Sequence, residues 1–260
     1  MAEPGSPAAG VILDIQEVDF SYGGSQALSG CTFGVNRATV TGLIGPNGAG
    51  KSTLIEIIAG GLRPSAGTIT FEGADIAGLG RVAIAKRGIV RTFQTSRELL
   101  RLPVIENVML AAQNQYGENL LSGVFGKSKW AKQEKELREE AATLLEWVGL
   151  GHAMDQRAGS LSGGQRRLLD MARALMAKPK MLLLDEPTAG VYPAIVQLMA
   201  ERINDVAKQG LAVLVVAHNM AFLEWVADDV VVMDQGRMLT RGHIDEVRRN
   251  ELVTTAYLGG

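Results

Sequence analysis

The apolar and polar positions of the chain predict strands of two kinds. Alternation of apolar and polar residues, which is typical of half-buried strands, occurs at 11–20 and 28–35. Unbroken apolar runs, which are typical of strands covered on both faces of a parallel sheet, occur at 38–44, 181–184 and 211–217. Shorter strands are expected at 67–73 and 88–94, and a hairpin is expected at 230–240.

Helices are expected between these strands, at 54–60, 81–87, 195–208 and 244–249. From Pro103 the spacing is helical for a longer stretch, which includes a charged helix at 129–150 and another helix at 166–177. A Gly-rich segment at 116–128 is expected to be a loop. Residues 95–158 therefore look like a helical insertion in a chain that otherwise alternates strand and helix, which is typical of α/β folds.

Composition narrows the class of protein. The 260 residues are 47% hydrophobic and 21% charged, an ordinary globular balance, and the net charge of −2 gives no strong attraction to nucleic acid or anionic lipid. The single cysteine, Cys31, rules out an internal disulfide and fits a reducing compartment; we expect it to be buried in its strand. We find no apolar run long enough to span a membrane and no signal peptide, and residues 1–10 are expected to be a flexible tail.

The segment Gly45–Thr53 fits the phosphate-binding pattern G-x-x-x-x-G-K-[ST], and it lies between a predicted strand and a predicted helix, as this pattern requires. Its backbone N–H groups and the helix N-terminus form a site of positive potential, to which Lys51 adds a full charge. Ser52 offers a hydroxyl to Mg²⁺. The residues expected to contact the nucleotide are Gly45, Asn47, Gly48, Ala49, Gly50, Lys51, Ser52 and Thr53.

A second candidate anion site is formed by Ser162, Gly163, Gly164 and Gln165, before the predicted helix at 166–177. Ser162 and Gln165 have the spacing of a capping box, which by itself indicates only the start of a helix. The two glycines expose N–H groups at a helix N-terminus, where an anion is favoured.

Polar residues follow three of the predicted strands at the end where open α/β sheets bind ligands. Two adjacent acids, Asp185 and Glu186, follow the strand at 181–184, and they imply a cation because two neighbouring carboxylates repel each other. If strand geometry continues through Glu186, the two side chains point in opposite directions, so we assign Asp185 to Mg²⁺ and Glu186 to the attacking water as its base. His218 and Gln94 end two other strands.

These motifs together resemble those of the ATP-binding subunits of ABC transporters, over nearly the whole chain. Leu161–Gln165 looks like the signature motif of that family, which other P-loop families lack. The resemblance implies an α/β P-loop NTPase core of the RecA-like type, with an antiparallel β subdomain and an α-helical subdomain. The implied boundaries are 1–10 for the tail, 11–94 for the first part of the core with the β subdomain, 95–177 for the helical subdomain with the signature, and 178–260 for the rest of the core.

The resemblance also implies a role for each site residue. Tyr22 would stack on adenine, although simple packing is the commoner role of such a ring, and Ser162, Gly163, Gly164 and Gln165 would contact the ATP of a partner subunit. The implied magnesium ligands are Ser52, Gln94 and Asp185. The implied catalytic residues are Glu186, His218 and Gln94.

A closer resemblance is to the ATPase subunits of branched-chain amino-acid importers, the LivG type. It rests on Gly88–Gln94 followed by Val104–Val108, on the long segment before the signature, and on the ending Ala256–Gly259. Importers of urea, amides and other solutes share much of this pattern, and lipid-handling ABC systems are a further alternative. The chain departs from the family at Tyr192, where many members have Asp.

The resemblance implies ATP and Mg²⁺ as ligands and a peripheral position on the cytoplasmic face of the inner (plasma) membrane. The implied partners are a second ATPase subunit, identical or paralogous and paired head to tail, membrane permease subunits that contact residues 95–115, and indirectly an extracytoplasmic solute-binding protein, with no nucleic acid. Two other classes stay open: a non-transport ABC ATPase, and a catalytically weak ATP-binding module. A small-molecule kinase is disfavoured because it has no need of Leu161–Gln165.

Overall fold

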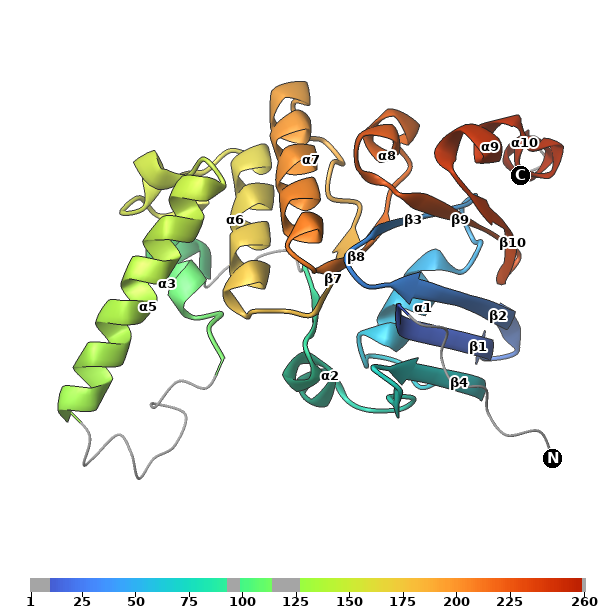
Figure 1. Cartoon of the computed structure of the whole chain (residues 1–260), viewed down its shortest axis with the longest axis horizontal. Coiled ribbons are helices and arrows are strands. Elements are labelled where there is room, and N and C mark those ends of the chain that lie inside the picture. Colours follow the sequence, from blue (N-terminus) through green and yellow to red (C-terminus); the bar gives the residue numbers. More distant parts are fainter. Residues whose placement is uncertain (1–9, 93–98, 114–126, 259–260) are drawn as a thin grey trace. The chain divides into compact units, whose positions relative to one another are not determined.

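The computed structural model describes residues 10–92, 99–113 and 127–258 (Figure 1). The chain divides into two compact units. The first, the core unit, contains residues up to 91, 180–187 and 200–260, and the second, the helical unit, contains 92–179 and 188–199. The expected tail at 1–10, apart from Gly10, and most of the expected loop at 116–128 lie outside the described residues.

A six-stranded sheet forms the centre of the core unit, with the strand order β10-β9-β3-β8-β7-β6. All neighbouring pairs are parallel except the hairpin of β9 and β10. Its strands are β3 (Val40–Ile44), β6 (Ile89–Arg91), β7 (Met181–Asp185), β8 (Ala212–Val216), β9 (Asp229–Asp234) and β10 (Arg237–Gly242). Every residue of β3 and β8 is buried, as expected for strands covered on both faces.

A second, four-stranded antiparallel sheet has the order β2-β1-β4-β5. It contains β1 (Val11–Tyr22), β2 (Ser25–Asn36), β4 (Ala66–Phe71) and β5 (Ala74–Asp75). Helix α1 (Lys51–Ile58) contacts strands of both sheets, and one hydrophobic cluster joins it to them (Figure 1). The start of α1, where a phosphate site would form, is therefore held by a continuous core.

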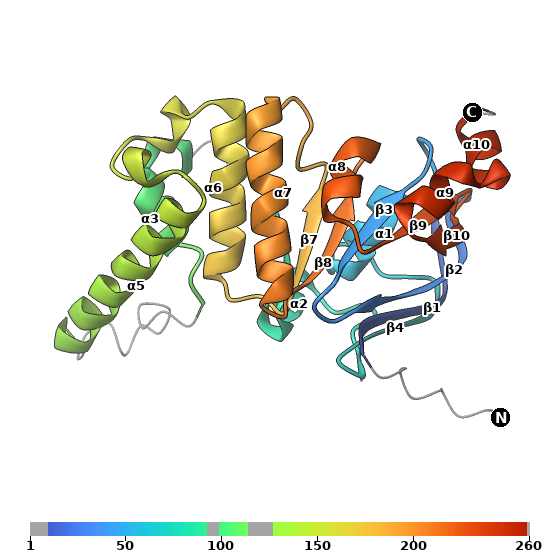
Figure 2. The same cartoon turned by 45° about the horizontal axis from the view of Figure 1, so that its top comes forward.

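Five further helices belong wholly or partly to the core unit: α2 (Arg81–Arg87), the end of α7 (Pro193–Lys208), α8 (Met220–Val226), α9 (Ile244–Arg249) and α10 (Glu251–Leu258) (Figure 2). Leu223 of α8 lies against Gly42 of β3, on the face of the sheet opposite to α1. Within the residues described, none of the helices combines the length and the apolar composition needed to cross a bilayer.

The helical unit contains α3 (Val104–Met109), α5 (Lys127–Trp147), α6 (Gly163–Met176) and the first part of α7. Three short 3₁₀ helices connect them, at Leu99–Arg101, Gly151–Ala153 and Ala158–Ser160. Buried residues of all four α-helices form one hydrophobic cluster, which includes Val104, Leu145, Leu169 and Met199. This unit therefore has a core of its own.

Cys31 is fully buried in β2, as expected. Burial raises the pKa of its thiol to about 12, because the apolar surroundings disfavour the thiolate.

The predicted α/β class and the P-loop core with a β subdomain and a helical subdomain are confirmed, but several predicted boundaries were wrong. The strand expected at 38–44 begins at Val40, because Ala38 has φ 55° in a turn. The strand expected at 88–94 is only Ile89–Arg91, because Gly88 has φ 100° and caps α2. Helix α8 was not predicted, and α10 replaces an expected tail.

Candidate functional site

The loop between β3 and α1 holds its shape through glycines that no other residue could replace. Gly45 has φ +150°, and a Cβ there would lie 2.1 Å from the carbonyl oxygen of Met233. Gly50 has φ +96° and is the N-cap of α1, and a Cβ there would lie 2.5 Å from the carbonyl oxygen of Ala27. The helix therefore begins at Lys51 and not at 54 as predicted, so the N–H groups of its first turn belong to the loop's residues.

Lys51 is 6% exposed, and its Nζ donates hydrogen bonds to the carbonyl oxygens of Gly45 at 2.7 Å and Pro46 at 2.9 Å. Burial lowers the pKa of this ammonium below its usual range, while the nearby carboxylates of Glu186 and Asp185 act in the opposite direction. The cation is thus held over the loop by its own backbone, close to two acids.

Asp185 and Glu186 have different partners, as predicted, but the reason given for it was wrong. Strand β7 ends at Asp185, and Glu186 has φ 47°, in the left-handed region that is unfavourable for a residue with a Cβ. A turn of the backbone, and not the alternation of a strand, therefore separates the two carboxylates. The N–H of Glu186 still donates to the carbonyl of Val216 at 2.9 Å, which fixes this turn to β8.

His218 lies just beyond the end of β8, with its Nε2 3.1 Å from Oε1 of Glu186. Its side chain is half exposed. Asn219, the next residue, caps α8 by accepting a hydrogen bond from the N–H of Phe222 at 3.1 Å. The position of His218 between a buried strand and a capped helix explains how the ring is placed against Glu186.

The core unit brings most of the predicted site residues into one cavity of about 340 Å³. Its walls are Ala27, Asn47, Gly48, Ala49, Gly50, Lys51, Ser52, Thr53, Asp185, Glu186, Val216 and His218. One side supplies N–H groups and a cation, and the other supplies two carboxylates and a histidine. Such a cavity can hold a phosphate chain beside a group able to accept a proton from water.

The oxygen donors of this cavity suit Mg²⁺. A hydroxyl, from Ser52, and a carboxylate, from Asp185, are hard ligands, and Mg²⁺ in nucleotide sites takes one or two such protein ligands and completes its shell with phosphates and water. In line with this, no group of three or more His, Cys, Asp or Glu residues that could hold a metal occurs in the described part of the chain.

Tyr22, at the end of β1, is 53% exposed, and its ring makes an edge contact with Phe20 at 4.8 Å between centroids. It does not line the cavity formed by the described residues. Gln94 lies outside the described residues.

A series of ion pairs next to the cavity was missed by the sequence analysis. Arg91, the last residue of β6, donates to Oδ2 of Asp185 at 2.9 Å and also pairs with Glu56 on α1. Glu56 in turn pairs with Arg81 of α2. An arginine at the end of an otherwise apolar strand was the available signal, because a cation there needs an anionic partner.

Glu56 gives this series a predictable pH dependence. Burial alone would raise the pKa of its carboxyl, but hydrogen bonds from Arg91 and Arg81 outweigh burial and hold the pKa below its usual range. A carboxyl with a depressed folded-state pKa contributes stability above its unfolded pKa of about 4.3, and this contribution is lost as the pH falls through the folded-state value. We expect Glu56→Gln to lower the Tm at about pH 7, and this deficit to shrink below about pH 4. Thermal melts over this range test it; a deficit that stays constant down to about pH 3 would contradict it.

The signature residues begin α6 in the helical unit, and the predicted capping box is present. The N–H of Gln165 donates to Oγ of Ser162 at 3.2 Å, and the N–H of Ser162 donates to Oε1 of Gln165 at 2.9 Å. The helix begins at Gly163 and not at 166 as predicted. Gly163 is exposed, whereas a Cβ on the buried Gly164 would lie 3.3 Å from side-chain carbons of Val191 and Ile195, so the second glycine is also needed for packing.

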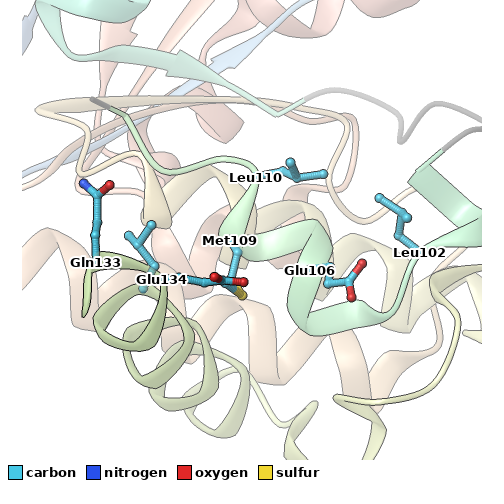
Figure 3. Close-up of a pocket in the computed structure, with 7 residues that line it drawn as sticks. Leu102, Glu106, Met109, Leu110, Gln133 and Glu134 are labelled. Carbon is cyan, nitrogen blue, oxygen red and sulfur yellow. The ribbon is translucent and has the colours of Figure 1, made fainter. Parts of the chain in front are cut away.

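A groove of about 240 Å³ lies between α3 and α5 of the helical unit (Figure 3). It is lined by Leu102, Glu106, Met109, Leu110, Gln133, Glu134 and Leu137. The buried amide of Asn107 supports the turn before α3 by donating to the carbonyls of Leu99 at 2.8 Å and Pro103 at 3.0 Å. The groove is apolar with two carboxylates, and Leu110 within it is 56% exposed.

Comparison with known proteins gives a consistent result. The family described as "ABC transporter" matches residues 28–189. A probable branched-chain amino acid transport ATP-binding protein LivG of Archaeoglobus fulgidus is 38% identical over 248 residues, 95% of each chain. The branched-chain amino acid transport ATP-binding protein BraF of Pseudomonas aeruginosa is 35% identical over 249 residues, which are 95% of this chain and 98% of that protein.

Solved structures resemble the fold over the same length. A nucleotide-free ATP-binding cassette from an ABC transporter matches with a TM-score of 0.84 and 36% identity, over 96% of this chain and all of that one. An ATP-binding cassette of an ABC transporter in its ADP conformation matches with a TM-score of 0.83 and 35% identity, over 96% and 99%.

Proposed function

Because this chain belongs to the ABC transporter family, as an ATP-hydrolysing subunit that powers a transporter, we propose that the transport it powers is the import of branched-chain amino acids. The observation that carries the ATPase assignment is the single cavity in which the P-loop meets Asp185, Glu186 and His218. The LivG and BraF relatives support the amino-acid substrate, since their names give it and they match this chain over 95% of its length.

In the proposed reaction, the oxygen of a water molecule attacks the γ-phosphorus of ATP, and the bond from that phosphorus to the bridging oxygen of ADP breaks. Glu186 accepts the proton that the water loses, and His218, at 3.1 Å from this carboxylate, orients it. Lys51 and the N–H groups of the loop stabilise the charge on the phosphate oxygens.

Ser52 and Asp185 are the residues in the cavity that would hold Mg²⁺, and Gln94 would join them. The ion, when bound, would neutralise charge on the phosphates. Removal of Mg²⁺ by a chelator is therefore expected to abolish hydrolysis.

A second ATPase subunit completes the site in this proposal. Ser162, Gly163, Gly164 and Gln165 contact the γ-phosphate bound by the partner's P-loop, so two copies or paralogues pair head to tail. The exposed N–H end of α6 supports this role, because it is a second site suited to an anion. Tyr22 stacks on adenine, which its half-exposed ring permits.

Membrane permease subunits are the partners through which hydrolysis acts. We assign the groove between α3 and α5 to a short permease helix, because it is an open apolar channel in a unit with its own rigid core (Figure 3). The subunit then lies on the cytoplasmic face of the membrane, and a solute-binding protein on the other side takes part indirectly.

Replacing Leu110 by glutamate is expected to weaken binding to the permease about 10-fold or more, because a charge in the groove opposes burial of an apolar helix. Leu252→Glu is a matched control, since Leu252 is exposed to a similar extent, 59%, on α10. Affinity for the permease complex in detergent measures this. Equal effects of the two substitutions would exclude the groove as the docking site.

The solute is tested by reconstituting this subunit with the permeases encoded beside it and their binding protein in liposomes. ATP-dependent uptake of leucine, isoleucine or valine is the expected result. Uptake of urea or an amide with no uptake of these amino acids would overturn the substrate and leave the ATPase assignment intact.

A further inference from the structure

The geometry points to Arg91 as a positioning residue that sets the spacing between Ser52 and Asp185, the two sides of the proposed magnesium site. This inference rests on the proposed use of Mg²⁺ at that site. It concerns a residue outside the P-loop, the signature and the acidic pair.

Arg91 joins two parts of the core unit that each carry one proposed ligand. Its two terminal nitrogens bind different carboxylates, one on Asp185 at 2.9 Å and one on Glu56. Glu56 follows Ser52 by four residues on α1, so the two lie on the same face of that helix, one turn apart. Arg91 therefore connects the helix that carries Ser52 to the strand end that carries Asp185.

The surroundings of Arg91 make this connection rigid. Its side chain is 16% exposed, and those of Glu56 and Asp185 are 23% and 25% exposed. Its backbone belongs to β6, which pairs in parallel with β7 through Arg91 and Leu183. The planar guanidinium has a fixed fork of donors, so two carboxylates held by it keep a fixed separation, which the point charge of a lysine would not impose.

The contact with Asp185 also selects which of its oxygens faces the cavity. Arg91 engages Oδ2, so Oδ1 lies outside this ion pair. Groups that orient the ligands of a metal in this way affect its affinity by about 10- to 100-fold.

A different role for the same cation would be competition, in which Arg91 repels the metal from Asp185. The two roles predict opposite signs. If Arg91 positions Asp185, its removal weakens the effect of Mg²⁺, and if Arg91 competes, its removal strengthens that effect.

The test measures the affinity for a fluorescent ATP analogue in excess Mg²⁺ and in excess EDTA, in a Glu186→Gln background that prevents turnover. The ratio of the two affinities isolates the contribution of the metal. We expect Arg91→Gln to reduce this ratio about 10-fold while the affinity in EDTA changes less than about 2-fold. Arg91→Lys, which keeps the charge and loses the fork, is expected to lie between Arg91→Gln and the parent.

Arg81→Gln is the matched control, because Arg81 pairs with the same Glu56 but its side chain is 61% exposed. An exposed ion pair contributes little, so the ratio is expected to change less than about 2-fold. Melting temperatures show whether each variant is folded, and if Arg91→Gln is not, the ratio for Arg91→Lys decides alone.

An unchanged or increased ratio for the folded Arg91 variants would overturn the inference. So would an equal loss of affinity in Mg²⁺ and EDTA, which would indicate a general structural role. If the parent itself binds the analogue equally well with and without Mg²⁺, the magnesium proposal fails instead, and the two failures are thereby distinguished.

Discussion

Replacing Glu186 by glutamine is expected to lower the rate of ATP hydrolysis by about 10²- to 10⁴-fold while ATP binding persists. The amide has nearly the shape of the carboxylate and can still reach Nε2 of His218, which lies 3.1 Å from Oε1 in the native chain. It cannot accept the proton of the attacking water. Since hydrolysis would normally separate the two subunits, the variant should also accumulate as an ATP-bound dimer.

Phosphate release under steady-state conditions and size-exclusion chromatography with ATP measure the two effects. Glu201→Gln is the control, because Glu201 is an exposed acid on α7 in the same unit of the chain. A Glu186→Gln variant that hydrolyses ATP at near the native rate would remove Glu186 from the mechanism. A native chain with no ATPase activity of its own would instead favour a coupling module that only binds ATP.

Replacing Lys51 by methionine is expected to lower the affinity for ATP by about 10- to 100-fold, because charge-assisted hydrogen bonds to the phosphates contribute about 1.5–3 kcal/mol. Methionine retains the length and apolar stem of the buried side chain, so the packing around it is preserved. The carbonyl oxygens of Gly45 and Pro46 lose their donor, so we also expect some loss of stability.

Isothermal titration with ATP and a thermal melt separate these two consequences. Lys132→Met is the control, since the side chain of Lys132 is 80% exposed on α5 and its removal should alter neither measurement. Unchanged ATP affinity in a folded Lys51→Met variant would contradict the assignment of the loop.

Elements with strong local signals could be predicted from the sequence to the residue. Helices α2 and α9 have the predicted bounds Arg81–Arg87 and Ile244–Arg249, because glycine or a capping residue borders each of them. Helix α8 was missed although its cap, Asn219, and its apolar spacing were visible. Helix α10 was missed because it is short and its neighbour Asn250 was not recognised as a cap; Oδ1 of Asn250 accepts from the N–H of Leu252 at 2.9 Å.

The candidate site was predictable in its membership and less so in its geometry. Motif spacing identified Lys51, Asp185 and Glu186, because each follows a strand that the apolar pattern marks. The left-handed backbone of Glu186 was not predictable, since local propensity disfavours it and the surrounding structure imposes it. The contact of Arg91 with Asp185 joins residues 94 positions apart, so no local pattern could reveal it.

The buried thiol of Cys31 has a practical consequence for measuring motion. With a pKa of about 12, about one such thiol in 10⁵ is ionised at pH 7, and maleimide dyes react with the thiolate. Cysteines introduced at exposed positions, one in each compact unit, can therefore be labelled without first removing the native one. The native chain is thus ready for fluorescence measurements of how the distance between its two units changes with nucleotide.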